Sequence, residues 1–197
     1  MSDKIIPVLV LNNDNDAKKI ADIAMKYHVS KLEITLRTPN ALSIIEALSS
    51  YAPDIDIGAG TILSADQALS AKNAGASFFV SPGMTVNLIN NMQPYYADWY
   101  AGVATISEAM LLREYNIKQA KFFPAILMGG VAWLKNIQSL LPDMMFFPTG
   151  GLNSDNINEF CALDNVCYAG GTWLASSALL NAQDFKKIEQ NFRNIYG

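Results

Sequence analysis

The feature that most constrains this chain is a recurring pair of segments, a short apolar run followed by an amphipathic stretch, repeated roughly every 25 residues. This alternation is typical of parallel βα units. Eight runs are predicted to be strands, at 5–11, 31–36, 55–58, 77–80, 99–103, 120–123, 145–147 and 166–168. Eight helices are predicted between and after them, at 16–27, 40–51, 64–74, 86–92, 107–115, 131–141, 154–162 and 184–196.

Eight βα units in 197 residues predict an α/β fold, a closed (β/α)8 or TIM barrel that forms a single domain over residues 1–197. An open, doubly wound sheet is the alternative. No Gly-x-Gly-x-x-Gly motif follows the first run, which disfavours a dinucleotide-binding sheet. In a barrel, functional side chains are expected where strands end and the following loops begin.

Composition and charge exclude several classes of protein. Hydrophobic residues make up 51% of the chain and charged residues 16%, which indicates a large core. The longest stretch without a polar side chain, 122–134, has 13 residues, fewer than the ~20 that a membrane span needs. The net charge is −4 and the basic residues are scattered, so a nucleic acid is not expected as a partner. Two cysteines, Cys161 and Cys167, are too few for a disulfide framework, so we expect both to be reduced and the protein to be cytoplasmic.

The single histidine, His28, excludes further kinds of chemistry. Zinc enzymes need two or three imidazole ligands, and Ser-His or Cys-His nucleophile systems need a histidine base. His28 follows a predicted helix, where a surface position is expected. The chemistry therefore falls to lysine, glutamate, arginine or the backbone, and neither a metal nor a cofactor is predicted.

The second junction, over 31–38, carries an unusual alternation. Glu33, Thr35 and Arg37 alternate with apolar residues, so a strand would place the three polar side chains on one face. Strands of a parallel barrel are buried on both faces, and charged side chains in the lumen are unfavourable unless paired or used. The pattern predicts functional residues, and a purely structural ion pair stays the alternative.

The sixth junction places Lys121 inside an apolar strand. Lysine is rare in such a position, and the neighbouring phenylalanines would desolvate it. Desolvation and a nearby cation such as Arg37 are the two means by which a lysine becomes nucleophilic. The alternative is a lysine that extends its ammonium group from the strand end into solvent.

Glycine pairs occur at the seventh and eighth junctions, in 148–152 and 169–172. The loops after strands seven and eight frequently build the phosphate site of a barrel, and glycine exposes backbone N–H groups to an anion. Gly58-Ala-Gly-Thr61 and Ser81-Pro-Gly83 offer similar close approach at junctions three and four. A lumenal lysine, a carboxylate, an arginine and a phosphate cradle together predict Schiff-base chemistry on a phosphorylated keto acid.

The same motifs, in order and spacing, are similar to those of the 2-keto-3-deoxy-6-phosphogluconate (KDPG) aldolase family. They cover nearly the whole chain and are Leu32-Glu-Ile-Thr-Leu-Arg-Thr38, Gly58-Ala-Gly-Thr61, Ser81-Pro-Gly83, Lys121-Phe-Phe-Pro-Ala125, Pro148-Thr-Gly-Gly151 and Gly170-Gly-Thr-Trp173. The resemblance implies a class I aldolase of the Entner–Doudoroff pathway, a homotrimer of (β/α)8 barrels that cleaves KDPG to pyruvate and glyceraldehyde 3-phosphate.

The resemblance also implies roles for individual residues. Lys121 would form the Schiff base and Glu33 would be the general acid/base, acting through water. The substrate would be bound by Arg37 and Thr61 at its carboxylate, by Pro82 and Phe123 along the pocket wall, and by Gly150, Gly151 and Thr172 at its phosphate.

Two segments depart from the family pattern, Ile126-Leu-Met128 where a glutamate and small polar residues are usual, and Ala104 where serine is usual. Both lie near the mouth of the predicted barrel, so substrate breadth stays open, including the galactonate epimer and 4-hydroxy-2-oxoglutarate. Two other functions also stay open. One is a sugar-phosphate isomerase or epimerase that uses Glu33 as its base, and the other is a non-catalytic phosphate or keto-acid binding protein.

Overall fold

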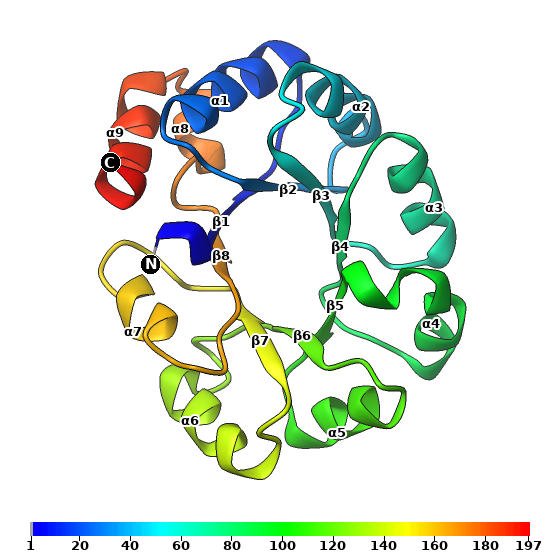
Figure 1. The fold of residues 1–197 in the computed structure, drawn as a ribbon. Coiled ribbons are helices and arrows are strands. Elements are labelled where there is room, and N and C mark those ends of the chain that lie inside the picture. Colours follow the sequence, from blue (N-terminus) through cyan, green and yellow to red (C-terminus); the bar gives the residue numbers. More distant parts are fainter. Residues whose placement is uncertain (1) are drawn as a thin grey trace.

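The computed structural model describes residues 2–197, which form a barrel of eight parallel strands surrounded by helices (Figure 1). Each strand pairs with its neighbours in the order β7-β6-β5-β4-β3-β2-β1-β8. The predicted (β/α)8 fold is confirmed. The strands are β1 (Ile5–Leu9), β2 (Lys31–Thr35), β3 (Asp56–Gly60), β4 (Phe78–Val80), β5 (Trp99–Val103), β6 (Gln119–Phe122), β7 (Met145–Pro148) and β8 (Ala169–Gly171).

The helices lie outside the strands in chain order, as Figure 1 shows. Most of the longer ones begin at a side-chain cap, such as Thr105, which forms a capping box with Glu108 at the start of α5. The α-helices are α1 (Asp14–Lys26), α2 (Ala41–Tyr51), α3 (Ala65–Asn73), α4 (Val86–Asn91), α5 (Ile106–Glu114), α6 (Gly130–Leu140), α7 (Ile157–Cys161), α8 (Ser177–Asn181) and α9 (Phe185–Tyr196). Two short 3-10 helices are also present, η1 (Ser2–Lys4) and η2 (Gln93–Asp98).

Three of these elements were not predicted. Both 3-10 helices and the five-residue α8 lack the long apolar period by which a helix is recognised in a sequence. The helix α8 follows β8 directly and precedes α9, so the last βα unit carries one helix more than the others.

The last strand lies three residues later than predicted. Residues 166–168 are apolar enough to indicate a strand, but Val166 makes only an isolated bridge to Phe146. The ladder with β1 begins at Ala169 and includes two glycines, which disfavour strands in general. Glycine is required here because a Cβ atom at Gly170 would lie 2.6 Å from the backbone oxygen of Ile6.

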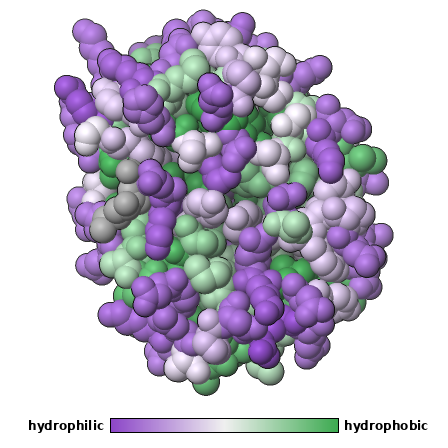
Figure 2. All heavy atoms as spheres, viewed as in Figure 1, coloured by the Kyte–Doolittle hydropathy of each residue, from purple (hydrophilic) through white to green (hydrophobic). Residues whose placement is uncertain are grey.

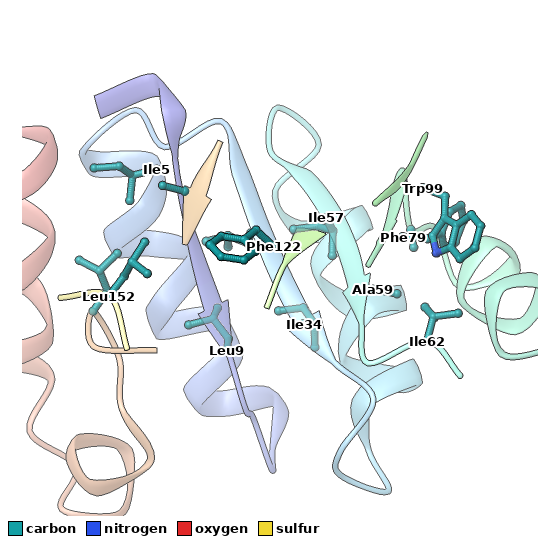
Figure 3. Close-up of a cluster of buried hydrophobic side chains, with 14 of the residues drawn as sticks. Ile5, Leu9, Ile34, Ile57, Ala59, Ile62, Phe79, Trp99, Phe122 and Leu152 are labelled. Atoms are coloured by element: carbon teal, nitrogen blue, oxygen red, sulfur yellow. The ribbon is translucent and has the colours of Figure 1, made fainter. Parts of the chain in front are cut away.

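The main core fills the space between the strands and the helices (Figure 3). Side chains that point outward from successive strands, including Leu9, Ile34, Ile57 and Trp99, pack there together and are almost fully buried. Because strand side chains alternate, the residues between them must face the lumen. On β2 these are Glu33 and Thr35.

The surface is mostly polar, with apolar residues between the charged ones (Figure 2). His28 is exposed, as predicted, and adopts a left-handed backbone with φ of 54° after α1. Within residues 2–197 no helix is both long and apolar enough to cross a lipid bilayer.

Candidate active site

A buried ion pair lies at the centre of the lumen. The Lys121 Nζ atom on β6 is 3.7 Å from the Glu33 Oε1 atom on β2, and the residues are 5% and 0% exposed. Lys121 is the one buried lysine among residues 2–197. The geometry agrees with the predicted lumenal position of both residues and brings them together from strands far apart in the barrel.

Glycines on the neighbouring strands allow close packing around these side chains. A Cβ atom at Gly60 of β3 would overlap the Glu33 carboxylate, and one at Gly102 of β5 would overlap the backbone of Pro82. Gly102 is also the register partner of Lys121. The lumen at this level therefore holds charged groups where other barrels pack branched apolar side chains.

The Glu33 carboxyl group is chemically unusual. Burial raises its pKa above the ordinary value, and the charges of Lys121 and Arg37 only partly oppose this effect. Neither carboxyl oxygen makes a hydrogen bond within the described part of the chain. A carboxyl group with these properties can both hold and accept a proton, which suits an acid/base role.

An aromatic layer closes the barrel beneath the ion pair. The Tyr100 ring packs edge-on against the rings of Phe78, Phe147 and Tyr168. The Lys31 ammonium lies 5.5 Å from the centroid of Phe78 and 5.7 Å from that of Tyr168, at the amino-terminal end of the strands. The carboxyl ends of the strands, where functional side chains of a barrel are expected, lie on the other side of the ion pair.

Arg37 lies farther out than expected. We predicted a lumenal side chain, but β2 ends at Thr35, and Arg37 is exposed in the turn that follows. Its Nε atom donates a hydrogen bond of 3.1 Å to the Thr61 hydroxyl. Because this bond uses Nε alone, the two terminal nitrogens remain available for a carboxylate at the rim of the lumen.

Thr61 has a backbone that β-branched residues rarely adopt, with φ of 62°. Such a conformation costs about 1–3 kcal/mol and persists where surrounding structure holds it. Here the neighbouring Ile62 N–H donates to the Val80 carbonyl, and the Leu36 N–H donates to the Gly60 carbonyl. The strained residue is the one whose hydroxyl accepts the hydrogen bond from Arg37, and strained backbone is frequent at functional sites.

Phe123 directly follows the strand that carries Lys121, and the backbone of Pro82 lies against Gly102, the register partner of Lys121. Pro82 follows Ser81, which is held by a hydrogen bond from the Trp99 indole at 2.8 Å. The centroid of the Phe123 ring is 5.3 Å from the Lys121 ammonium. Phe123 therefore provides an apolar neighbour for Lys121, and Pro82 lies one strand away.

Gly150 and Gly151 follow β7 with φ of 94° and 84°, in the left-handed region that favours glycine. An isolated bridge from Thr149 to Gly170 places this turn next to the loop after β8, which carries the exposed Thr172. The three residues predicted for phosphate therefore come from adjacent loops at the mouth. We call the Gly150–Gly151 turn the glycine cradle.

Comparison with known proteins decides the family. The model of the family "KDPG and KHG aldolase" matches residues 1–191. The chain belongs to the KDPG and KHG aldolase family. A 2-dehydro-3-deoxy-phosphogluconate aldolase of Pseudomonas aeruginosa is 37% identical over 187 residues, covering 95% of this chain and 85% of the relative. Membership of this family makes the protein an aldolase, and therefore a lyase.

Solved structures of KDPG aldolases have the same fold. The enzyme from Legionella pneumophila, with pyruvate captured as a covalent carbinolamine intermediate, superposes with a TM-score of 0.93 at 35% identity, covering 100% of this chain and 95% of that one. The enzyme from Zymomonas mobilis with 3-phosphoglycerate gives a TM-score of 0.90 at 33% identity, covering 98% and 91%.

One buried polar residue beside the glycine cradle was not singled out by sequence reasoning. Thr149 precedes the glycine cradle, is 4% exposed, and its hydroxyl makes no hydrogen bond with residues 2–197. It lies two positions after the lumenal Phe147, so alternation turns it toward the lumen. The strand parity of Pro148-Thr-Gly-Gly was the signal that could have found it.

Proposed function

We propose that this protein is a class I aldolase that cleaves KDPG to pyruvate and glyceraldehyde 3-phosphate through a Schiff base on Lys121. The observation that carries the proposal is the buried lysine beside a buried carboxyl group in the lumen of the barrel. The Legionella relative, in which pyruvate was captured as a carbinolamine, supports the same chemistry.

In this reaction the neutral Lys121 amine attacks the C2 carbonyl of the keto acid, and the carbinolamine loses water to give an iminium ion. Glu33, directly or through a water molecule, takes the proton of the C4 hydroxyl, and the C3–C4 bond breaks. The bonding electrons move into the iminium to form an enamine, and the aldehyde leaves. Glu33 returns the proton to C3, and hydrolysis releases pyruvate and the free lysine.

We propose that Arg37 and Thr61 bind the carboxylate of the keto acid. The terminal nitrogens of Arg37 form a planar fork that matches a carboxylate, and the Thr61 hydroxyl can donate while it accepts from Arg37. Pro82 and Phe123 would exclude water around the three-carbon unit held on Lys121.

Arg37→Lys is expected to raise the KM for pyruvate in deuterium exchange roughly ten-fold or more, because a charged hydrogen bond is worth about 1.5–3 kcal/mol and about 1.4 kcal/mol is a factor of ten. The positive charge is kept, so only the fork is lost. Arg113→Lys, another exposed arginine, is the control. An unchanged KM would make Arg37 a structural counter-ion of Glu33.

We propose that the glycine cradle and Thr172 bind the phosphate, with the buried Thr149 hydroxyl free to bond a substrate hydroxyl between the cradle and Lys121. Left-handed glycines present successive N–H groups to an anion, and the loops after strands seven and eight are the common phosphate site of barrels. The 3-phosphoglycerate bound by the Zymomonas relative is a ligand of the same chemical class.

Removing the phosphate from the substrate is expected to lower kcat/KM by about 10²-fold or more, because two charge-assisted hydrogen bonds of about 1.5 kcal/mol or more each are lost. Pyruvate imine formation should be nearly unchanged, since pyruvate does not reach the cradle. Steady-state rates on the two substrates measure this. Equal kcat/KM on the two substrates would contradict the role of the cradle in phosphate binding and would favour 4-hydroxy-2-oxoglutarate as the substrate.

We further propose activity on 4-hydroxy-2-oxoglutarate, which the family description supports by naming KHG aldolase, and a cytoplasmic role in the Entner–Doudoroff pathway. A homotrimer is proposed on the family resemblance. Exposed apolar side chains on α2, α3, α4 and the loop after β3 would suit burial between subunits, and they are Leu42, Leu63, Leu69 and Val86.

Incubation with pyruvate and borohydride, followed by mass measurement, tests the proposed function directly. A Schiff base is reduced to a stable secondary amine, so the protein should gain the mass of one reduced pyruvate adduct. An isomerase that uses Glu33 as a base, or a binding protein that only holds a keto acid, would keep its original mass.

A further inference from the structure

The loop after β6 contacts the glycine cradle through an apolar residue that the proposed reaction does not use. This loop, residues 123–129, connects the strand that carries Lys121 to α6. Its Ala125 N–H donates to the Thr149 carbonyl at 2.8 Å, and its Ile126 N–H donates to the Gly150 carbonyl at 3.2 Å. The loop and the cradle are therefore held edge to edge.

Side chains of the loop after β6 also pack against the glycine cradle. A Cβ atom at Gly150 would lie 3.1 Å from the Phe123 ring, and one at Gly151 would lie 2.8 Å from Cγ1 and 2.9 Å from Cβ of Ile126. The Ile126 side chain thus covers the face of Gly151 on which other residues carry their own side chain. Two consecutive glycines have few intrinsic restraints on φ, so such a contact limits how the turn can rotate.

Ile126 is suited to this contact by its shape. It is branched at Cβ and has few rotamers, and its Cδ1 atom also approaches Gly130 at the start of α6, 3.9 Å from the site of a Cβ atom there. Leu127, the next residue, is 83% exposed and lies outside these contacts.

We propose that Ile126 is a positioning residue for phosphate recognition, which fixes the direction of the cradle N–H groups and so sets the preference for phosphorylated substrates. The inference rests on the proposed function of the cradle. Because the loop begins two residues after Lys121, the same contact also fixes the distance between the imine and the phosphate.

Ile126→Ala is expected to lower kcat/KM for KDPG by about 10- to 100-fold through KM, since a displacement of roughly 1 Å can cost a factor of 10². The rate on 2-keto-3-deoxygluconate, which lacks the phosphate, should stay within about two-fold of wild type. The rate of pyruvate deuterium exchange should stay within the same limit, because mutational effects at independent sites add only to within roughly two-fold. Ile126→Val keeps the branch at Cβ and should therefore keep the wild-type preference for the phosphorylated substrate. Leu127→Ala is the matched control and should behave as wild type.

Amide chemical shifts of Gly150 and Gly151 during titration with inorganic phosphate give a readout independent of turnover. In Ile126→Ala both shifts should respond more weakly and at higher phosphate concentration. The proposal is overturned if Ile126→Ala keeps the wild-type preference, or if it loses pyruvate exchange in equal measure, which would indicate an effect on Lys121. A wild-type protein whose glycine amides do not respond to phosphate would instead overturn the cradle itself.

Discussion

Lys121→Met is expected to abolish both KDPG cleavage and pyruvate trapping by borohydride. Every bond-breaking step of the proposed reaction runs through an imine on this residue, and enzymatic enhancements of about 10⁶-fold or more depend on such steps. Methionine fills a similar volume, so the lumen is not left with a cavity. The raised pKa of Glu33 lets that carboxyl group become neutral when its partner is removed.

Lys135→Met serves as the control, because Lys135 is an exposed lysine on α6. It should keep full activity and full trapping. Peptide mapping of the wild-type adduct adds a second test, and an adduct on a lysine other than Lys121 would contradict the assignment. An isomerase that uses Glu33 as its base would retain activity in Lys121→Met.

Glu33→Gln is expected to lower cleavage and deuterium exchange at the pyruvate methyl group by roughly 10²- to 10⁴-fold, the usual contribution of a general acid/base. Glutamine keeps the size and hydrogen-bonding groups of the side chain but cannot take a proton. Borohydride trapping should persist, at a lower rate if Glu33 also moves protons during loss of water from the carbinolamine.

The pH profile of wild-type cleavage provides a further check on Glu33. The carboxyl group must be ionised to take the C4 hydroxyl proton, so the rate should fall as pH decreases through its pKa. Because burial raises that pKa, the acid limb should lie above the ordinary range of glutamate and should be absent from the residual activity of Glu33→Gln. Near wild-type rates in the variant would leave Glu33 as only the ion-pair partner of Lys121.

Much of the fold and the centre of the site could be predicted because both depend on local patterns. The βα period identifies the barrel, and a charged residue within an apolar strand, such as Glu33 or Lys121, can only face the lumen or destabilise the core. The family motifs then predict the loops around the mouth. These inferences need no knowledge of distances between strands.

Other features depend on contacts that a local pattern does not contain. The last strand includes glycine because Gly170 must pass Ile6 and Phe147 closely, a condition set by β1 and β7. Arg37 lies at the rim because β2 ends two residues earlier. Strand parity could place Thr149 on the lumenal face, but its 4% exposure and its unpartnered hydroxyl depend on the packed structure.

The aromatic layer beneath Lys121 has a kinetic consequence. Tyr100 and its aromatic neighbours fill the lower end of the barrel, so in the proposed reaction the substrate and both products would share one passage at the other end. On the proposed reaction, pyruvate is held covalently at the bottom of that passage, while the phosphorylated aldehyde occupies its entrance. The products therefore leave in a compulsory order, aldehyde before pyruvate, and each turnover ends only when the deeper product has followed the first one out.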